Sequence, residues 1–170
     1  MDRRIRHHLG RAKAAAQDGP ARARAQVLRH VVDFGEVFAK IYVGKAVKFD
    51  LDVPADLTVA CEAQDLDEML GNLLDNAFKW SHGHVKVGAS EAGSDVVIAI
   101  QDDGAGLSDG ELPEALLPGR RLDESVPGYG FGLPITRELA ELYGGSLSLS
   151  RSGLGGLKAE LRLPRGAGGS

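Results

Sequence analysis

Residues 65–81 read DLDEMLGNLLDNAFKWS, a run with two different faces when it is wound as a helix. Its apolar residues recur every three or four positions, which predicts a stripe buried in a core. The stripe consists of Leu66, Met69, Leu70, Leu73, Leu74 and Ala77. The run therefore predicts a helix over about 64–81 with one face packed inside the protein.

The same helix carries a ridge of polar side chains. Glu68, Asn72 and Asn76 stand four residues apart and so share one face. One carboxylate and two amides supply hard oxygen ligands, the kind that Mg²⁺ accepts alongside phosphates and water. Lys79 follows within a turn and could add a positive charge for a phosphate. A solvated polar face explains this helix alone equally well.

Periodicity outside this run predicts the remaining elements. Helical spacing covers 3–17, 21–42 and 133–143, and alternation predicts strands at 47–53, 58–62, 85–89, 96–101, 147–149 and 157–163. The breaker Asp18-Gly19-Pro20 separates the first two helices, and Gly144-Gly145 stops the last one. The sum predicts an α+β fold, a two-layer sandwich whose mixed, mostly antiparallel sheet is covered by helices on one face.

Composition describes an ordinary globular chain and excludes some partners. The 170 residues suit one domain, with 43% hydrophobic and 26% charged residues. A net charge of -4 argues against nucleic acid as the main partner, because phosphate backbones select basic surfaces. Cys61 is the single cysteine, so no internal disulfide forms, and we expect it in the core. No apolar run reaches the roughly 20 residues of a membrane helix, and we expect a cytoplasmic domain.

A second motif, IAIQDDGAGL, occupies residues 98–107. An apolar strand ends at Asp102, and Gly104 and Gly106 follow at once. A carboxylate held there can accept a hydrogen bond from an exocyclic amine, and the glycines let backbone approach a flat ligand closely. An ordinary turn is the alternative, because Asp-Gly is a common turn pair.

A third motif, PGYGFGLPITRELAELYGG, occupies residues 127–145. Its alternating Gly128, Gly130 and Gly132 precede a helix whose N-terminus can face phosphates through free N–H groups and the helix dipole. Alone, the glycines could equally form a flexible hinge. Their spacing differs from the dinucleotide fingerprint, and the P-loop pattern is absent. Residues 103–130 between the two glycine motifs form a long loop of the kind that is usually functional.

The order of these motifs carries a resemblance. A polar-ridged helix, a strand-end DxGxG, a long loop and a GxGxG opening a helix resemble the GHKL ATPases, named for gyrase, Hsp90, histidine kinases and MutL. The resemblance covers about 45–163 and is strongest to histidine kinases of the PhoQ type. GNLLDNAFKWS looks like their N box, QDDGAGL like the first glycine box, and GYGFGLPITRELAELYGG like the second. It implies the Bergerat fold, ATP and Mg²⁺ as ligands, and 103–130 as the ATP lid.

The resemblance also implies a role for each matched residue. Asn72 and Asn76 would hold Mg²⁺ and the ATP phosphates, and Asp102 would accept the adenine amino group. The nucleotide contacts implied in this way are Asn72, Asn76, Lys79, Trp80, Asp102, Gly104, Gly106, Arg121, Gly128, Tyr129, Gly130, Phe131, Gly132 and Leu133. The residues implied for catalysis are Asn72, Lys79 and Glu68, the last in a supporting role. For Arg121 a solvated charge is the alternative.

Histidine kinases phosphorylate a histidine on a separate dimerising hairpin. His7 and His8 lack the following acid and proline of that acceptor motif, so we expect this chain to lack its own acceptor. Residues 1–19 are then the end of the hairpin, 20–164 the catalytic ATP-binding domain, and 165–170 a disordered tail. The expected partners are ATP, that hairpin and the receiver domain of a response regulator. We expect this piece to be monomeric and its parent to be a homodimer anchored in the bacterial inner membrane.

Three other functions share the fold or the site. A GHKL ATPase would use the nucleotide to drive conformational change, and slow hydrolysis by this chain alone would favour it. An anti-sigma-type serine kinase would phosphorylate a serine on a partner. A nucleotide-binding pseudokinase would act only as an interaction module, although the retained Asn72, Asn76 and Asp102 argue against a dead pocket.

Overall fold

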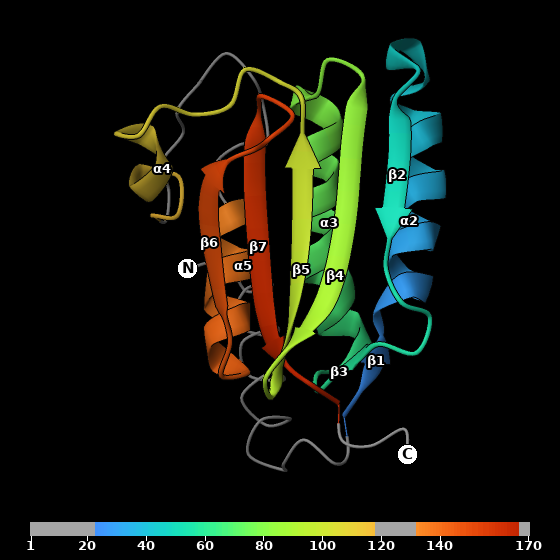
Figure 1. The fold of residues 1–170 in the computed structure, drawn as a ribbon, viewed down its shortest axis with the longest axis vertical. Coiled ribbons are helices and arrows are strands. Elements are labelled where there is room, and N and C mark those ends of the chain that lie inside the picture. Colours follow the sequence, from blue (N-terminus) through green and yellow to red (C-terminus); the bar gives the residue numbers. More distant parts are fainter. Residues whose placement is uncertain (1–22, 118–131, 167–170) are drawn as a thin grey trace.

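The computed structural model describes residues 23–117 and 132–166. Five strands of these residues form one sheet in the order β2–β4–β5–β7–β6 (Figure 1). The strands are β2 (Lys48–Asp52), β4 (His84–Ala92), β5 (Asp95–Asp102), β6 (Ser146–Arg151) and β7 (Leu157–Pro164). Only β2 and β4 run parallel, and the other neighbours are antiparallel. The sheet is therefore mixed and mostly antiparallel, as predicted.

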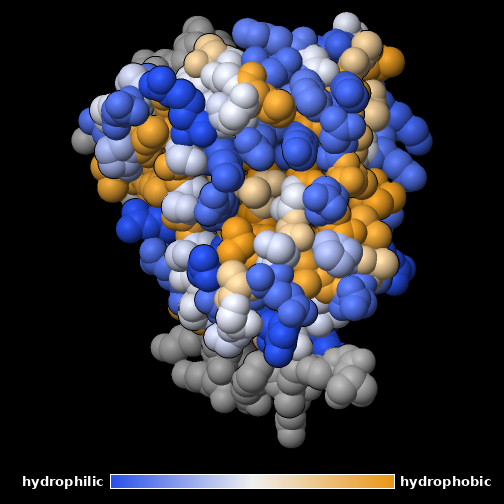
Figure 2. Space-filling model, in the orientation of Figure 1, coloured by the Kyte–Doolittle hydropathy of each residue, from blue (hydrophilic) through white to orange (hydrophobic). Residues whose placement is uncertain are grey.

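Three helices of the described residues cover one face of this sheet. They are α2 (Val27–Ile41), α3 (Ala63–Trp80) and α5 (Gly132–Leu142), which lie behind the strands in Figure 1. No described helix covers the opposite face, where apolar side chains lie among polar ones (Figure 2). The described residues thus form the predicted two-layer α+β sandwich.

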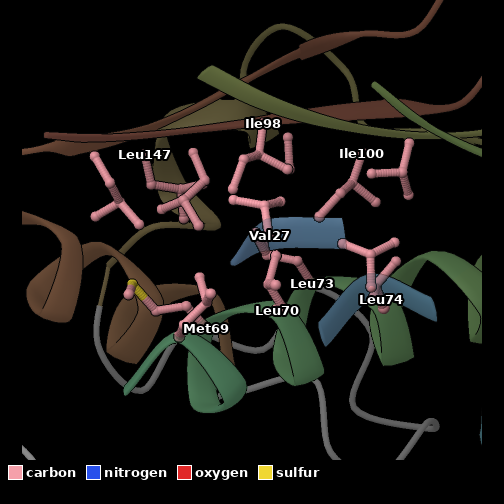
Figure 3. Packing of buried hydrophobic residues seen from close by; sticks show 14 of the residues in the cluster. Val27, Met69, Leu70, Leu73, Leu74, Ile98, Ile100 and Leu147 are labelled. Atoms are coloured by element: carbon pink, nitrogen blue, oxygen red, sulfur yellow. The ribbon is translucent and has the colours of Figure 1, made fainter. Parts of the chain in front are cut away.

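The core lies between the sheet and α3. Ile98, Ile100 and Leu147 point from the strands toward Met69 and its helical neighbours (Figure 3). All six residues of the predicted stripe on α3 are at most 3% exposed. Fully burying one such side chain contributes about 1.5–3 kcal/mol, so this stripe fixes how α3 lies on the sheet. Cys61 is also buried, as predicted, and burial raises the pKa of its thiol.

Two predicted boundaries are wrong, for one reason. The helix expected from residue 21 begins at Val27, because Ala25–Gln26 form a strand, β1. The strand expected over 58–62 is only β3, Thr58–Val59, which pairs antiparallel with β1. Ala25 and Gln26 continue the helical spacing of α2, and only a partner distant in the sequence makes them extended.

The same small sheet also orders part of the predicted tail. Gly166 N donates to Thr58 O at 2.9 Å, and Arg165 N donates to Ser94 O at 2.9 Å. Arg165 also forms a bridge with Val59. These two residues are therefore held in place, whereas 167–170 lie outside the described residues.

The ends of α5 and the connecting segments are well defined. Gly145 N donates to Ala140 O and Gly144 N to Glu141 O, with Gly144 at φ +81°, which is the Schellman stop that the Gly-Gly pair predicts. Short helices η1 (Val43–Lys45) and α4 (Glu111–Glu114) complete the described elements. In the part of the chain that the structure describes, no helix is both long and apolar enough to cross a membrane.

Candidate functional site

The polar ridge of α3 lies against the start of α5. Glu68, Asn72 and Asn76 are half-buried, on the side of α3 that the apolar stripe leaves free. A Cβ added to Gly132 would lie 3.7 Å from Asn72 Cβ, an ordinary van der Waals contact. Asn72 Nδ2 donates to Thr136 Oγ1 at 3.4 Å. The structure therefore brings the first predicted motif to the described end of the third.

Asp102 ends β5 and is only 3% exposed. Its Oδ1 accepts hydrogen bonds from Gly104 N at 2.8 Å and from Leu157 N at 3.3 Å. Burial raises the pKa of this carboxyl, although the two backbone N–H groups act in the opposite direction. Both of these bonds end on Oδ1. A fixed acceptor of this kind can recognise an amine.

Close backbone packing surrounds Asp102 and explains the glycines. A Cβ on Gly104 would meet Trp80 O at 2.2 Å, which no side chain could tolerate. A Cβ on Gly156 would meet Asp102 Oδ1 at 2.0 Å. Gly106 has φ +71° and packs against Gly156. The first glycine motif is therefore required by packing, and Gly156 is a site residue that the sequence analysis missed.

Asp103 has a different role from its neighbour. Its Oδ1 accepts from the backbone N–H groups of His82, Gly83 and His84 at 2.8, 3.1 and 3.1 Å. Burial alone would raise the pKa of this carboxyl, but the three donors lower it on balance. The side chain thereby fixes the turn between α3 and β4. The sequence around this Asp-Asp pair gives no indication that the second carboxylate holds the turn before β4.

The C-terminal end of α3 is held by a lysine that the sequence analysis did not single out. Lys45 Nζ donates to the carbonyls of Phe78 at 3.2 Å and Ser81 at 3.0 Å, and also to that of Lys79. A cation is favourable there because helix C-termini leave carbonyls unsatisfied and carry partial negative charge. Lys79 itself lies with Nζ 6.0 Å from the ring centroid of Trp80. The two predicted contacts at this end of α3 therefore sit on a fixed backbone.

The first part of the predicted lid is ordered. Ser108 Oγ accepts from Glu111 N at 3.3 Å, and Glu111 Oε1 accepts from Ser108 N at 2.9 Å. This capping box closes the turn that leads into α4, whose first residue is Glu111, and its S-x-x-E pattern was available in the sequence as a signal. The bond from Ser108 lowers the pKa of Glu111. After α4, Ala115 is buried in the core.

Several predicted residues lie outside the described part of the chain. They are Arg121, Gly128, Tyr129, Gly130, Phe131, His7 and His8. Of the last glycine motif, Gly132 and Leu133 begin α5, and Leu133 is 6% exposed. Two open surface pockets of about 400 and 480 Å³ occur among the described residues, and neither is lined by Asn72, Asn76 or Asp102.

A buried strand-end carboxylate, a ridge of amides and the start of a glycine-led helix define a nucleotide-binding domain of the GHKL type. Residues 61–167 match the family described as "Histidine kinase-, DNA gyrase B-, and HSP90-like ATPase". The chain belongs to this family.

Within the family the similarity is to sensor histidine kinases. Sensor protein kinase CarS of Pseudomonas aeruginosa is 35% identical over 164 residues, which cover 96% of this chain and 36% of that protein. Two-component sensor PhoQ of the same organism is 33% identical over 162 residues, covering 95% of this chain and 36% of that protein. The chain thus spans 36% of the length of these relatives.

Solved structures agree on the fold. Mycobacterial sensor histidine kinase MprB superposes with a TM-score of 0.75 at 23% identity, over 84% of this chain and 97% of that one. The chain is therefore an ATP-binding domain of the histidine kinase type, and the predicted resemblance to PhoQ-type kinases is confirmed.

Proposed function

We propose that this domain binds ATP together with Mg²⁺ and transfers the γ-phosphoryl group to a histidine on a separate helical hairpin. One arrangement carries the proposal. The amide ridge of α3 lies against the start of α5, and the buried carboxylate at the end of β5 lies near the C-terminal end of α3. The names of the most similar relatives, which are sensor kinases, support the same reaction.

Asp102 would select adenine. Its Oδ1 is occupied by two backbone donors, so Oδ2 would accept from the exocyclic amino group of the base. Guanine carries a carbonyl oxygen at the corresponding position, and two acceptors would repel each other there. The pocket should therefore prefer ATP to GTP.

Asn72 and Asn76 would hold Mg²⁺. The ion takes one or two protein oxygens together with phosphates and water, so a pair of amides on one ridge fits it. Among the described residues no three His, Cys, Asp or Glu side chains gather into a metal group. When bound, Mg²⁺ would neutralise charge on the phosphates during in-line transfer.

The protein's own part in the reaction would be positioning. Lys79, which follows the two asparagines along α3, would offset phosphate charge, and Glu68 at the other end of the ridge would play a supporting role. The proposal includes three further parts. The acceptor histidine lies on the hairpin, a receiver domain takes the phosphoryl group onto an aspartate, and the parent protein is a dimer anchored in the inner membrane.

Calorimetric titration with ATP and with GTP, each with and without Mg²⁺, tests the pocket. We expect micromolar, magnesium-assisted binding of ATP and much weaker binding of GTP. Phosphorylation of an added histidine hairpin would then support the kinase. Absence of binding would instead favour a degenerate interaction module, and transfer to a serine partner would favour an anti-sigma-type kinase.

A further inference from the structure

Thr136 links the two helices that form the candidate metal site. It lies in the first turns of α5 and is fully buried. Its hydroxyl donates to Gly132 O at 2.8 Å, one helical turn earlier. The same oxygen accepts from Asn72 Nδ2 at 3.4 Å. One buried hydroxyl therefore joins the amide ridge to the start of α5.

The hydrogens in this chain of bonds can run in only one direction. A threonine hydroxyl has a single hydrogen, and here it points to a carbonyl, which can only accept. The Thr136 oxygen must therefore receive a hydrogen from Asn72, and only the Nδ2 end of that amide has one to give. With the amide reversed, Asn72 Oδ1 would face the Thr136 oxygen with no hydrogen between them.

The consequence falls on the oxygen of Asn72. Because Nδ2 donates to Thr136, Oδ1 is the other end of the amide, and it lies 4.0 Å from the position of a Cβ built on Gly132, at the very start of α5. We propose that Thr136 is a positioning residue, which sets the side-chain amide of Asn72 so that its oxygen is presented to Mg²⁺. This inference rests on the proposed function, because it concerns the same cation.

Such a residue need not contact the metal to affect it. Groups that orient a metal ligand typically change metal affinity by about 10- to 100-fold when they are lost. The bond from Asn72 is long, so we expect an effect at the lower end, about tenfold. Nucleotide affinity without metal should change less than affinity with metal, because the proposed effect of Thr136 is on the oxygen that Asn72 presents to the ion.

The test compares Thr136→Val, which keeps the shape and removes the hydroxyl, with Thr136→Ser, which keeps the hydroxyl. Calorimetry with ATP, with and without Mg²⁺, gives the factor by which the metal improves affinity. In Thr136→Val this factor should fall about tenfold, and Thr136→Ser should restore most of it. Thr58→Val, on β3, is the matched control and should leave the factor unchanged.

A second readout does not depend on the metal. In a ¹H–¹⁵N spectrum of the apo protein, the side-chain amide hydrogens of Asn72 should move in Thr136→Val and stay near their wild-type positions in Thr136→Ser. An unchanged magnesium factor in Thr136→Val would overturn the inference, and so would an equal loss of affinity with and without metal. A wild-type protein with no magnesium factor would instead overturn the proposed metal site, and the Asn72 resonances would still decide the orientation.

Discussion

In the proposed site, Asp102 would serve binding at the expense of stability. Its carboxylate is buried, and burial raises its pKa, so the fold favours the neutral form while recognition of an amine needs the charged one. Asparagine in its place keeps an oxygen for Gly104 N and Leu157 N but presents an N–H group to the base.

We therefore expect Asp102→Asn to weaken ATP binding by roughly 10- to 100-fold, the scale of a lost hydrogen bond to a charged group. Calorimetry measures the affinity, and urea denaturation should show no loss of stability in the absence of nucleotide. Asp103→Asn is the control: the adjacent carboxylate serves a turn, so this change should leave ATP affinity near wild type. Equal affinities for Asp102→Asn and wild type would remove Asp102 from the pocket.

The same carboxyl predicts a dependence on pH. A raised folded pKa means that Asp102 favours folding fully below its unfolded pKa, about 3.9, and that this contribution is lost as pH rises through the folded value. Binding of ATP should follow the opposite course, because a proton on Oδ2 would lie where the proposed bond from adenine needs an acceptor. The ratio of Kd for Asp102→Asn to Kd for wild type should therefore decrease toward one as pH falls. The ratio cancels the titration of ATP itself, and a ratio that stays constant as pH falls from 8 toward the unfolded pKa, about 3.9, would contradict this prediction.

At the scale of elements, α3 and α5 are joined by two polar links. Asn72 meets Thr136 at one, and the Tyr143 hydroxyl donates to the fully buried Asp65 at the other. The partners are seven residues apart on each side, two turns or about 10 Å, and run in opposite order, with Tyr143 directly after the last residue of α5. The helices are therefore antiparallel, and each link falls on the same face.

We expect Tyr143→Phe to lower the free energy of unfolding by about 1–3 kcal/mol, because Asp65 stays buried and loses a hydrogen-bond donor. Glu62 N, which donates to the same hydroxyl at 3.3 Å, loses its acceptor. Tyr42→Phe is the matched control, since Tyr42 OH donates to Asp75 at 2.6 Å in a half-buried position where water can replace it. Urea denaturation measures both free energies of unfolding. Equal decreases in the two variants would show that the buried bond between Tyr143 and Asp65 stabilises the fold no more than the half-buried one.

Periodicity predicted the elements better than their ends. The stripe on α3 and the alternation of β5 and β7 are local patterns, because each lies within one segment that packs one face on the core. They can therefore be recognised in the sequence alone. The start of α2 depends on the pairing of β1 with β3. The hydrogen bonds from Lys45 to the end of α3 likewise join residues more than 30 positions apart. Such pairings have no local pattern, which is why they were not predicted.

At the scale of the whole molecule, the candidate site joins segments that are distant in the sequence. The motifs predicted Asn72, Asp102 and the start of α5, because each belongs to a local pattern of its own. They did not predict Gly156 or Thr136, which act through a neighbour from another element. Geometry between elements is the part of the site that a single sequence does not contain.

The same assembly predicts how the nucleotide should affect stability. A ligand that contacts α3, β5 and α5 together binds only when all three are in place, so it stabilises the folded state as a unit. At a free ATP concentration of 100 times Kd the gain is about 2.7 kcal/mol. For a domain of this size that corresponds to a rise in Tm of roughly 5–10 °C. Differential scanning calorimetry should show one transition that moves as a whole.

GTP and the Asp102→Asn variant provide the controls for that shift. GTP with the wild-type protein and ATP with the variant should both shift Tm less at the same concentrations, because both lack the bond between the base and Asp102. For the variant, a 10- to 100-fold weaker Kd leaves a gain of about 0.4–1.4 kcal/mol, at most about half of the wild-type gain. A transition that splits when ATP is added would mean that α5 does not fold with the sheet. A full shift in Asp102→Asn would mean that ATP is held by its phosphates alone, and the carboxylate at the end of β5 would then serve only to organise Gly104 and Leu157.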